Sequence, residues 1–158
     1  TSEPPHPERG PDLAAELATP GLRSALRSRN DIPDTKTDIY IADTLGELGL
    51  WCRLAPLVVM GGSLVPHGGH NPLEPARFGC AVIFGIHMFN FSEATAGLLG
   101  AGGARQVPET SGLAEVAASL LGAPATCRQM GERGLRYATG HEAVVETLRA
   151  AILDRLPR

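Results

Sequence analysis

A glycine-rich loop, set between a short apolar run and a proline-containing helix start, most constrains how this chain can fold. The apolar run is Leu57–Met60, and residues 61–75 after it read GGSLVPHGGHNPLEP. Four apolar residues followed by glycines are typical of a strand buried in a parallel sheet. Asn71 is a favourable N-cap, Pro72 fits the first helical position, and Glu74 has capping-box spacing. The segment therefore predicts a strand, a loop and a helix in direct succession.

The same segment predicts a binding site for an anion. Its glycines, Gly61, Gly62, Gly68 and Gly69, allow sharp turns and a close approach of the backbone to a ligand. Free N–H groups at a helix N-terminus attract phosphates, because several donors converge there and the helix dipole is positive. Spacing alone favours a second interpretation, in which Glu74 only caps the helix.

Predicted strands and helices alternate along the chain. Apolar runs predict strands at Ile39–Ala42, Leu57–Met60, Ala81–Phe84 and Ala104–Val107. Apolar residues at helical spacing predict helices over residues 12–28 (with a break at Pro20), 44–54, 71–78, 92–99, 112–121, 124–137 and 142–156. We expect residues 1–11, which hold four prolines, to be irregular, and residues 12–158 to form one domain. This order is typical of a doubly wound α/β sheet, in which ligands bind at the carboxyl ends of the strands.

Composition excludes several classes of protein. The 158 residues are enough for one domain with a core, and the net charge of −3 disfavours a broad nucleic-acid surface. Cys52, Cys80 and Cys127 form no CxxC pair, which predicts buried, reduced thiols. The chain has no run of 18 apolar residues, so we expect no membrane-spanning helix.

Two histidines beside the central glycines, His67 and His70, admit more than one interpretation. Histidine is a common metal ligand, but the spacing supplies no third ligand, which disfavours zinc. We expect no metal in this site, and we expect His70 to donate a hydrogen bond to a phosphate or a carboxylate.

Four segments carry a resemblance to one protein family. They are PHPER at residues 5–9, DTLGEL at 43–48, the glycine-rich loop with NPLEP at 61–75, and GIHMFNF at 85–91. In this order and spacing they resemble the C-terminal half of bacterial 3-deoxy-D-manno-octulosonic acid (Kdo) transferases, over nearly the whole chain. The resemblance implies a Rossmann-like parallel sheet within a GT-B glycosyltransferase of two such domains. The N-terminal domain and the first two strands of the C-terminal domain would precede Thr1, so we expect a partial domain with C-terminal helices.

The resemblance implies the transfer of Kdo from CMP-Kdo to the lipid A precursor, a step in lipopolysaccharide biosynthesis. The full enzyme would associate peripherally with the cytoplasmic face of the bacterial inner membrane. CMP-Kdo would be the donor substrate, with no cofactor, and the acceptor would bind through the N-terminal domain. No nucleic-acid partner is implied. Two alternatives stay open: a non-catalytic nucleotide-binding remnant, and another nucleotide-sugar enzyme with the GT-B architecture.

The resemblance also implies which residues hold the nucleotide. The residues implied to bind CMP are Pro4, Pro5, Leu45, Gly46, Glu47, Asn71, Pro72, Leu73 and Glu74. Possible contacts to the donor phosphate or sugar are Ser63, Gly69 and His70. With the resemblance, ribose binding becomes the favoured role of Glu74, whereas Glu47 stays open between a ligand contact and a helix cap.

This chain also departs from the pattern of the family. Pro5 stands where the family carries Arg, and Ile86 stands where it carries Pro. No catalytic residue is assigned here, because the general-base glutamate of the family lies in the N-terminal domain. We therefore expect the isolated chain to be inactive in transfer.

Overall fold

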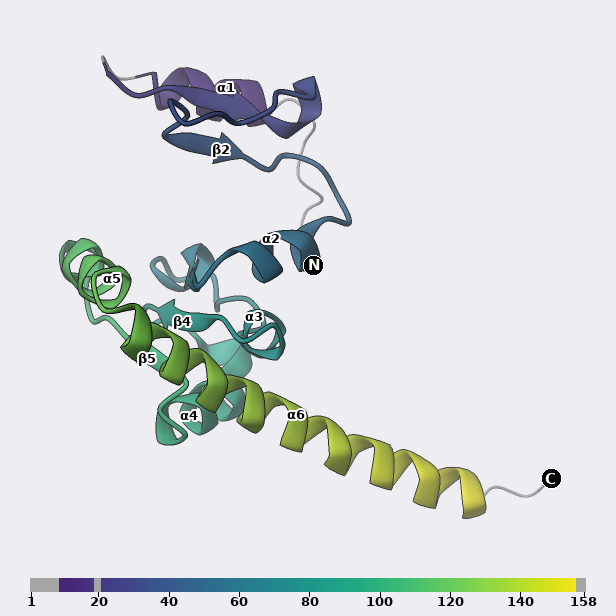
Figure 1. Cartoon of the computed structure of the whole chain (residues 1–158). Coiled ribbons are helices and arrows are strands. Elements are labelled where there is room, and N and C mark those ends of the chain that lie inside the picture. The colour runs from purple at the N-terminus through teal and green to yellow at the C-terminus, as the bar shows by residue number, and fades with distance from the viewer. Residues whose placement is uncertain (1–8, 19–20, 156–158) are drawn as a thin grey trace. The chain divides into compact units, whose positions relative to one another are not determined.

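A computed structural model describes residues 9–18 and 21–155, with side chains for residues 10–18 and 21–140. The chain divides into two compact units, Thr1–Leu48 and Gly49–Arg158, and each unit holds a parallel sheet (Figure 1). The predicted α/β class is therefore confirmed. The sequence predicts one sheet, however, whereas the described strands form two: β1-β2 in the first unit and β3-β4-β5 in the second.

The first unit contains one helix and two short strands among its described residues. Helix α1 spans Arg9–Glu16, and strands β1 (Ser24–Leu26) and β2 (Ile39–Ile41) pair in parallel with Leu26 opposite Ile41. A 3-10 turn, Arg27–Arg29, follows β1 directly. Ala25, Leu26 and Ile41 are all buried, and the burial of these apolar side chains stabilises the two strands.

The helix predicted over residues 12–28 is wrong in its second half. Leu22 and Leu26 have helical spacing, but Leu26 is buried in strand β1 while Leu22 is exposed. Gly21 has a φ of +100°, a conformation outside the helical region that glycine adopts without strain, so the predicted helix cannot continue through it. Helix α1 also begins earlier than predicted, because Pro11 lies in its first turn, where a missing N–H costs no hydrogen bond.

The second unit has three parallel strands, surrounded by helices. The strands are β3 (Leu57–Met60), β4 (Ala81–Phe84) and β5 (Ala104–Gln106). The helices are α2 (Leu48–Leu54, which begins at the unit boundary), α3 (Leu73–Arg77), α4 (Ser92–Gly100), α5 (Leu113–Leu121) and α6 (Pro124–Arg155). Three 3-10 turns are Gly61–Ser63, Phe89–Phe91 and Thr110–Gly112. All three strands lie where the apolar runs predict them.

Strand β4 is the centre of this sheet and is buried on both faces. Val82 and Phe84 pack on one face, with Leu98 of α4 in the same cluster. Ala81 and Ile83 pack on the other face, with Leu120 of α5. Successive residues of a strand point to opposite faces, so a fully apolar strand needs a cover on each face. Helices supply that cover, as in a doubly wound fold.

Helix α6 is continuous, although the sequence predicts two helices with a break after Tyr137. It spans 32 residues and extends well past the sheet in Figure 1. No proline interrupts it after Pro124, and the single Gly140 at the expected break costs only about 1 kcal/mol in a helix. Its first half packs tightly against the turn before β4, because a β carbon on Gly131 would come within 1.9 Å of the Gly79 carbonyl oxygen.

Candidate functional site

Two loops follow strands β3 and β4 where these parallel strands end, and Ser63 joins them. The Ser63 hydroxyl donates a hydrogen bond to the Met60 carbonyl and accepts one from the Gly85 N–H at 2.7 Å. The Ser63 carbonyl accepts a further hydrogen bond from the His87 N–H at 3.1 Å. Ser63 is fully buried, so its hydroxyl connects the two loops inside the protein. Its predicted contact with a ligand stays a prediction.

The paired glycines of the first loop lie against the second loop. Gly68 and Gly69 have φ values of +91° and +78°, which other residues rarely adopt. A β carbon on Gly68 would come within 2.2 Å of Asn90 Nδ2, and one on Gly69 within 2.3 Å of Met88 Sδ. The Asn90 N–H also donates to the Gly68 carbonyl at 3.2 Å. The two loops therefore form one packed assembly, which leaves little room for either to move alone.

The NPLE residues lead from this assembly into α3. The Asn71 side-chain oxygen accepts a hydrogen bond from the Leu73 N–H at 3.1 Å, while Pro72 and Leu73 are buried. Helix α3 has only five residues, shorter than the predicted helix over 71–78. The Glu74 carboxylate is exposed and makes no hydrogen bond to any other described residue. The capping box that spacing favours for Glu74 is thus not formed in the described part of the chain, and the carboxylate is accessible to a ligand.

His70 is exposed, and its ring lies over Gly62, where a β carbon would come within 2.8 Å of His70 Nε2. His67 is also exposed. Across the residues that the structure describes, no cluster of three or more His, Cys, Asp or Glu side chains is arranged to hold a metal ion.

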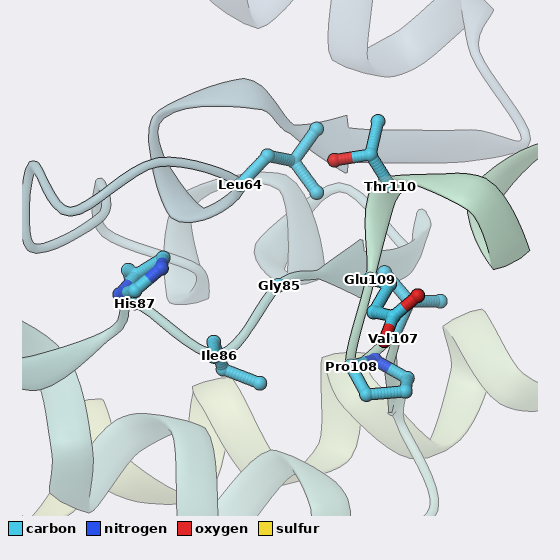
Figure 2. A pocket seen from close by; sticks show the side chains of 8 residues that line it. All are labelled: Leu64, Gly85, Ile86, His87, Val107, Pro108, Glu109 and Thr110. Carbon is cyan, nitrogen blue, oxygen red and sulfur yellow. The ribbon is translucent and has the colours of Figure 1, made fainter.

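A pocket of about 260 Å³ opens beside the second loop, at the carboxyl ends of β4 and β5 (Figure 2). Its lining residues are Leu64, Gly85, Ile86, His87, Val107, Pro108, Glu109 and Thr110. Figure 2 shows the His87 ring on one side of the pocket and the Glu109 and Thr110 side chains on the other. The sequence motifs did not indicate residues 107–110. Their position at and directly after the end of a predicted parallel strand was the one available signal.

The 43–47 turn in the first unit is tied to the residues after β1. Arg27 Nε and one terminal nitrogen of its guanidinium donate to the Glu47 carboxylate at 3.0 and 2.8 Å, and the Thr44 hydroxyl also donates to it. Both interactions, with Arg27 the stronger, hold the pKa of Glu47 below its usual value. The helix predicted to begin after Thr44 begins only at Leu48, because Gly46 has a φ of +81°, which an α-helix does not accommodate.

The tripeptide implied to bind CMP occupies this turn. Leu45 is 71% exposed although it is apolar, and Gly46 has a φ of +81°. Leu45, Gly46 and Glu47 lie in the first unit, whereas Asn71 to Glu74 and Ser63, Gly69 and His70 lie in the second. Pro4 and Pro5 lie outside the described residues.

Comparison with known proteins identifies relatives of this chain. No protein-family model matches the chain. It is 35% identical over 146 residues to the 3-deoxy-D-manno-octulosonic acid transferase of Haemophilus influenzae, covering 92% of this chain and 34% of the relative. The Bordetella pertussis transferase of the same name is 33% identical over 154 residues, covering 97% of this chain and 36% of that protein. The chain thus spans about a third of the length of these relatives.

A solved structure is similar over most of the chain. It is the crystal structure of the C-terminal CMP-Kdo binding domain of WaaA from Acinetobacter baumannii, with a TM-score of 0.77 and 27% sequence identity. The match covers 84% of this chain and 69% of that domain. The resemblance expected from the four motifs, and the fold that it implies, are therefore confirmed.

Proposed function

We propose that this chain, a relative of the Kdo transferases along nearly its whole length, is the donor-binding part of such a glycosyltransferase. The observation that carries the proposal is the likeness to a solved CMP-Kdo binding domain over 84% of the chain. The accessible Glu74 carboxylate in the NPLE motif supports the same conclusion, because ribose hydroxyls donate hydrogen bonds to such a group in nucleotide-binding folds.

The packed loops suit the role of holding a leaving group. In the proposed reaction the acceptor hydroxyl displaces CMP from the anomeric carbon of Kdo, and negative charge develops on the departing phosphate. Donors that are fixed before the reaction stabilise such charge best, because they need not reorganise. Ser63, Gly68 and Gly69 fix the two loops after β3 and β4 in the way this role requires.

The other half of the chemistry is proposed to come from outside this chain. The acceptor hydroxyl needs a general base, which typically contributes about 10²–10⁴-fold to the rate, and we assign no base among these residues. We propose that the complete protein uses the lipid A precursor as acceptor, needs no cofactor beyond its donor, and acts at the inner membrane. None of the helices in the described ranges is both long and apolar enough to cross a bilayer.

Calorimetry with CMP tests the proposal. We expect the purified chain to bind CMP, and Glu74→Gln to weaken the binding about tenfold, since a hydrogen bond to a charged group contributes about 1.5–3 kcal/mol. Glu115→Gln is the matched control, because Glu115 is also an exposed acid in the first turn of a helix. A folded chain that binds no CMP would contradict the proposal. Equal losses of CMP affinity in the two variants would show that Glu74 has no specific role in binding CMP.

A further inference from the structure

The residues that follow strands β1 and β2 are joined by side chains in a way that the nucleotide motifs do not explain. After β1 come Arg27 and Ser28, and after β2 come Asp43 and Glu47. Arg27 Nε and a terminal nitrogen reach the two oxygens of Glu47, at 3.0 and 2.8 Å. Ser28 donates to Asp43 twice, from its N–H at 2.8 Å and from its hydroxyl at 2.6 Å. Two side-chain attachments therefore fix the turn at its first and last residues.

Leu45 and Gly46 lie in the turn between these two attachments. Leu45 and Gly46 are exposed, and Gly46 needs a positive φ. An exposed apolar side chain on a turn without such attachments would sample many conformations, because fixing each residue costs conformational entropy. The forked guanidinium fixes direction as well as distance when it meets a carboxylate with two nitrogens. The contacts of Arg27 thus determine where the exposed part of the turn lies.

We propose that Arg27 is a positioning residue for nucleotide binding, acting through Glu47 to hold the Leu45–Gly46 turn in the conformation that receives CMP. The inference rests on the proposed function, and it assigns Glu47 the role of an anchor for the turn. The two oxygens of Glu47 are already used by Arg27 and Thr44, so Glu47 anchors the turn from behind instead of reaching for a ribose.

The expected size of the effect follows from the fraction of the protein in which the turn has the binding-competent conformation. Apparent affinity falls in proportion to the fraction of protein that is in the binding-competent conformation. An exposed ion pair stabilises one conformation only modestly, so its loss should change that fraction by roughly fivefold at most. We therefore expect Arg27→Gln to weaken CMP binding about fivefold, with Arg27→Lys between that variant and the unchanged protein, because lysine keeps the charge but loses the fork.

The test combines calorimetry with amide hydrogen exchange in the ligand-free chain. Arg136→Gln is the control, since Arg136 is also an exposed arginine but lies in α6, in the second unit. We expect Arg27→Gln to raise the exchange rate of the Gly46 amide and to weaken CMP binding, while Arg136→Gln changes neither. Because Arg27 acts through Glu47, Arg27→Gln combined with Glu47→Gln should weaken binding no more than the stronger single change.

Each of the other outcomes contradicts a specific part of the proposal. CMP binding by the unchanged chain, with equal binding by Arg27→Gln, would overturn the role of Arg27 and leave the proposed function intact. Additive losses in the double variant would overturn the path through Glu47. Absence of CMP binding by the folded, unchanged chain would contradict the proposed function and the nucleotide role of Arg27 together. The Gly46 exchange rate would then report only whether Arg27 holds the turn.

Discussion

At the scale of single residues, some polar groups of the second unit join its loops. Ser63 is the clearest case, since one buried hydroxyl bonds the end of β3 to the first residue after β4. Its hydrogen bonds link two loops that are far apart in sequence, so no local pattern could have indicated them. The sequence suggested contact with a ligand as the role of Ser63, and that role stays a prediction.

Ser63→Ala should lower the free energy of unfolding by about 1–3 kcal/mol, because it leaves the Gly85 N–H and the Met60 carbonyl without their buried partner. Urea denaturation measures this directly. Ser119→Ala, at an exposed position in α5, should change the stability by less than about 0.5 kcal/mol. Equal stabilities of the two variants would show that the Ser63 hydroxyl does not join the loops.

Cys80 gives a prediction for alkaline pH. Burial raises the pKa of this thiol from 9.0 to about 11, and Cys80 Sγ donates to the Cys52 carbonyl at 3.0 Å. Between these two values the unfolded chain loses the proton while the folded chain keeps it, so stability falls as the pH rises from 9 to 11. Cys80→Ala should make this fall shallower in urea denaturation across that range. An unchanged slope would contradict the raised pKa.

At the scale of elements, apolar runs were reliable and helical spacing was less so. Residues 57–60 and 81–84 were predictable as strands, because four successive apolar residues beside glycines are typical of a strand in a parallel sheet. The predicted burial holds for β4, whereas Val59 of β3 is 37% exposed. Strand β1 was missed, because three residues are too few to show a period of two. The break expected after Tyr137 is absent from α6, because a single glycine in a helix costs only about 1 kcal/mol. Predicting an element was therefore easier than predicting where it ends.

Gly69→Ala tests the packing of the two loops. The new methyl group would collide with Met88 and impose a positive φ on alanine, so we expect a loss of about 1–3 kcal/mol in stability. Gly100→Ala is the control, because Gly100 lies at the end of α4 with open space where the methyl group would go. It should be neutral or slightly stabilising. If the two variants melt at the same temperature, the loops are not packed as described.

At the scale of the whole molecule, the motifs predicted the family and the α/β class, but not the arrangement of the chain. The strand at residues 39–41 pairs with residues 24–26, in a sheet separate from the other three strands. Which strands pair depends on contacts between distant residues, which the pattern of any one segment does not encode. The pocket lined by Glu109 and Thr110 was missed for the same reason, since residues from three segments form it.

Pro5 provides a test that uses the whole chain. The resemblance implies an arginine at this position, and a guanidinium that meets a phosphate makes charge-assisted hydrogen bonds. We expect Pro5→Arg to strengthen CMP binding about tenfold in calorimetry, since such bonds contribute about 1.5–3 kcal/mol. Pro33→Arg adds the same charge at an exposed position and should have little effect. Equal gains from both changes would indicate general attraction between charges and no specific contact.

The most direct test of the central claim is an NMR titration of the ¹⁵N-labelled chain with CMP. The account predicts saturable shifts that concentrate in two segments, Leu45–Glu47 and Leu73–Glu74, with small shifts in α5. Inorganic phosphate at the same concentration should shift these amides less, because it lacks the ribose and the base. Absence of saturable shifts in a folded chain would contradict the claim that this protein binds the nucleotide of a sugar donor. Saturable shifts confined to other segments would contradict the assigned site.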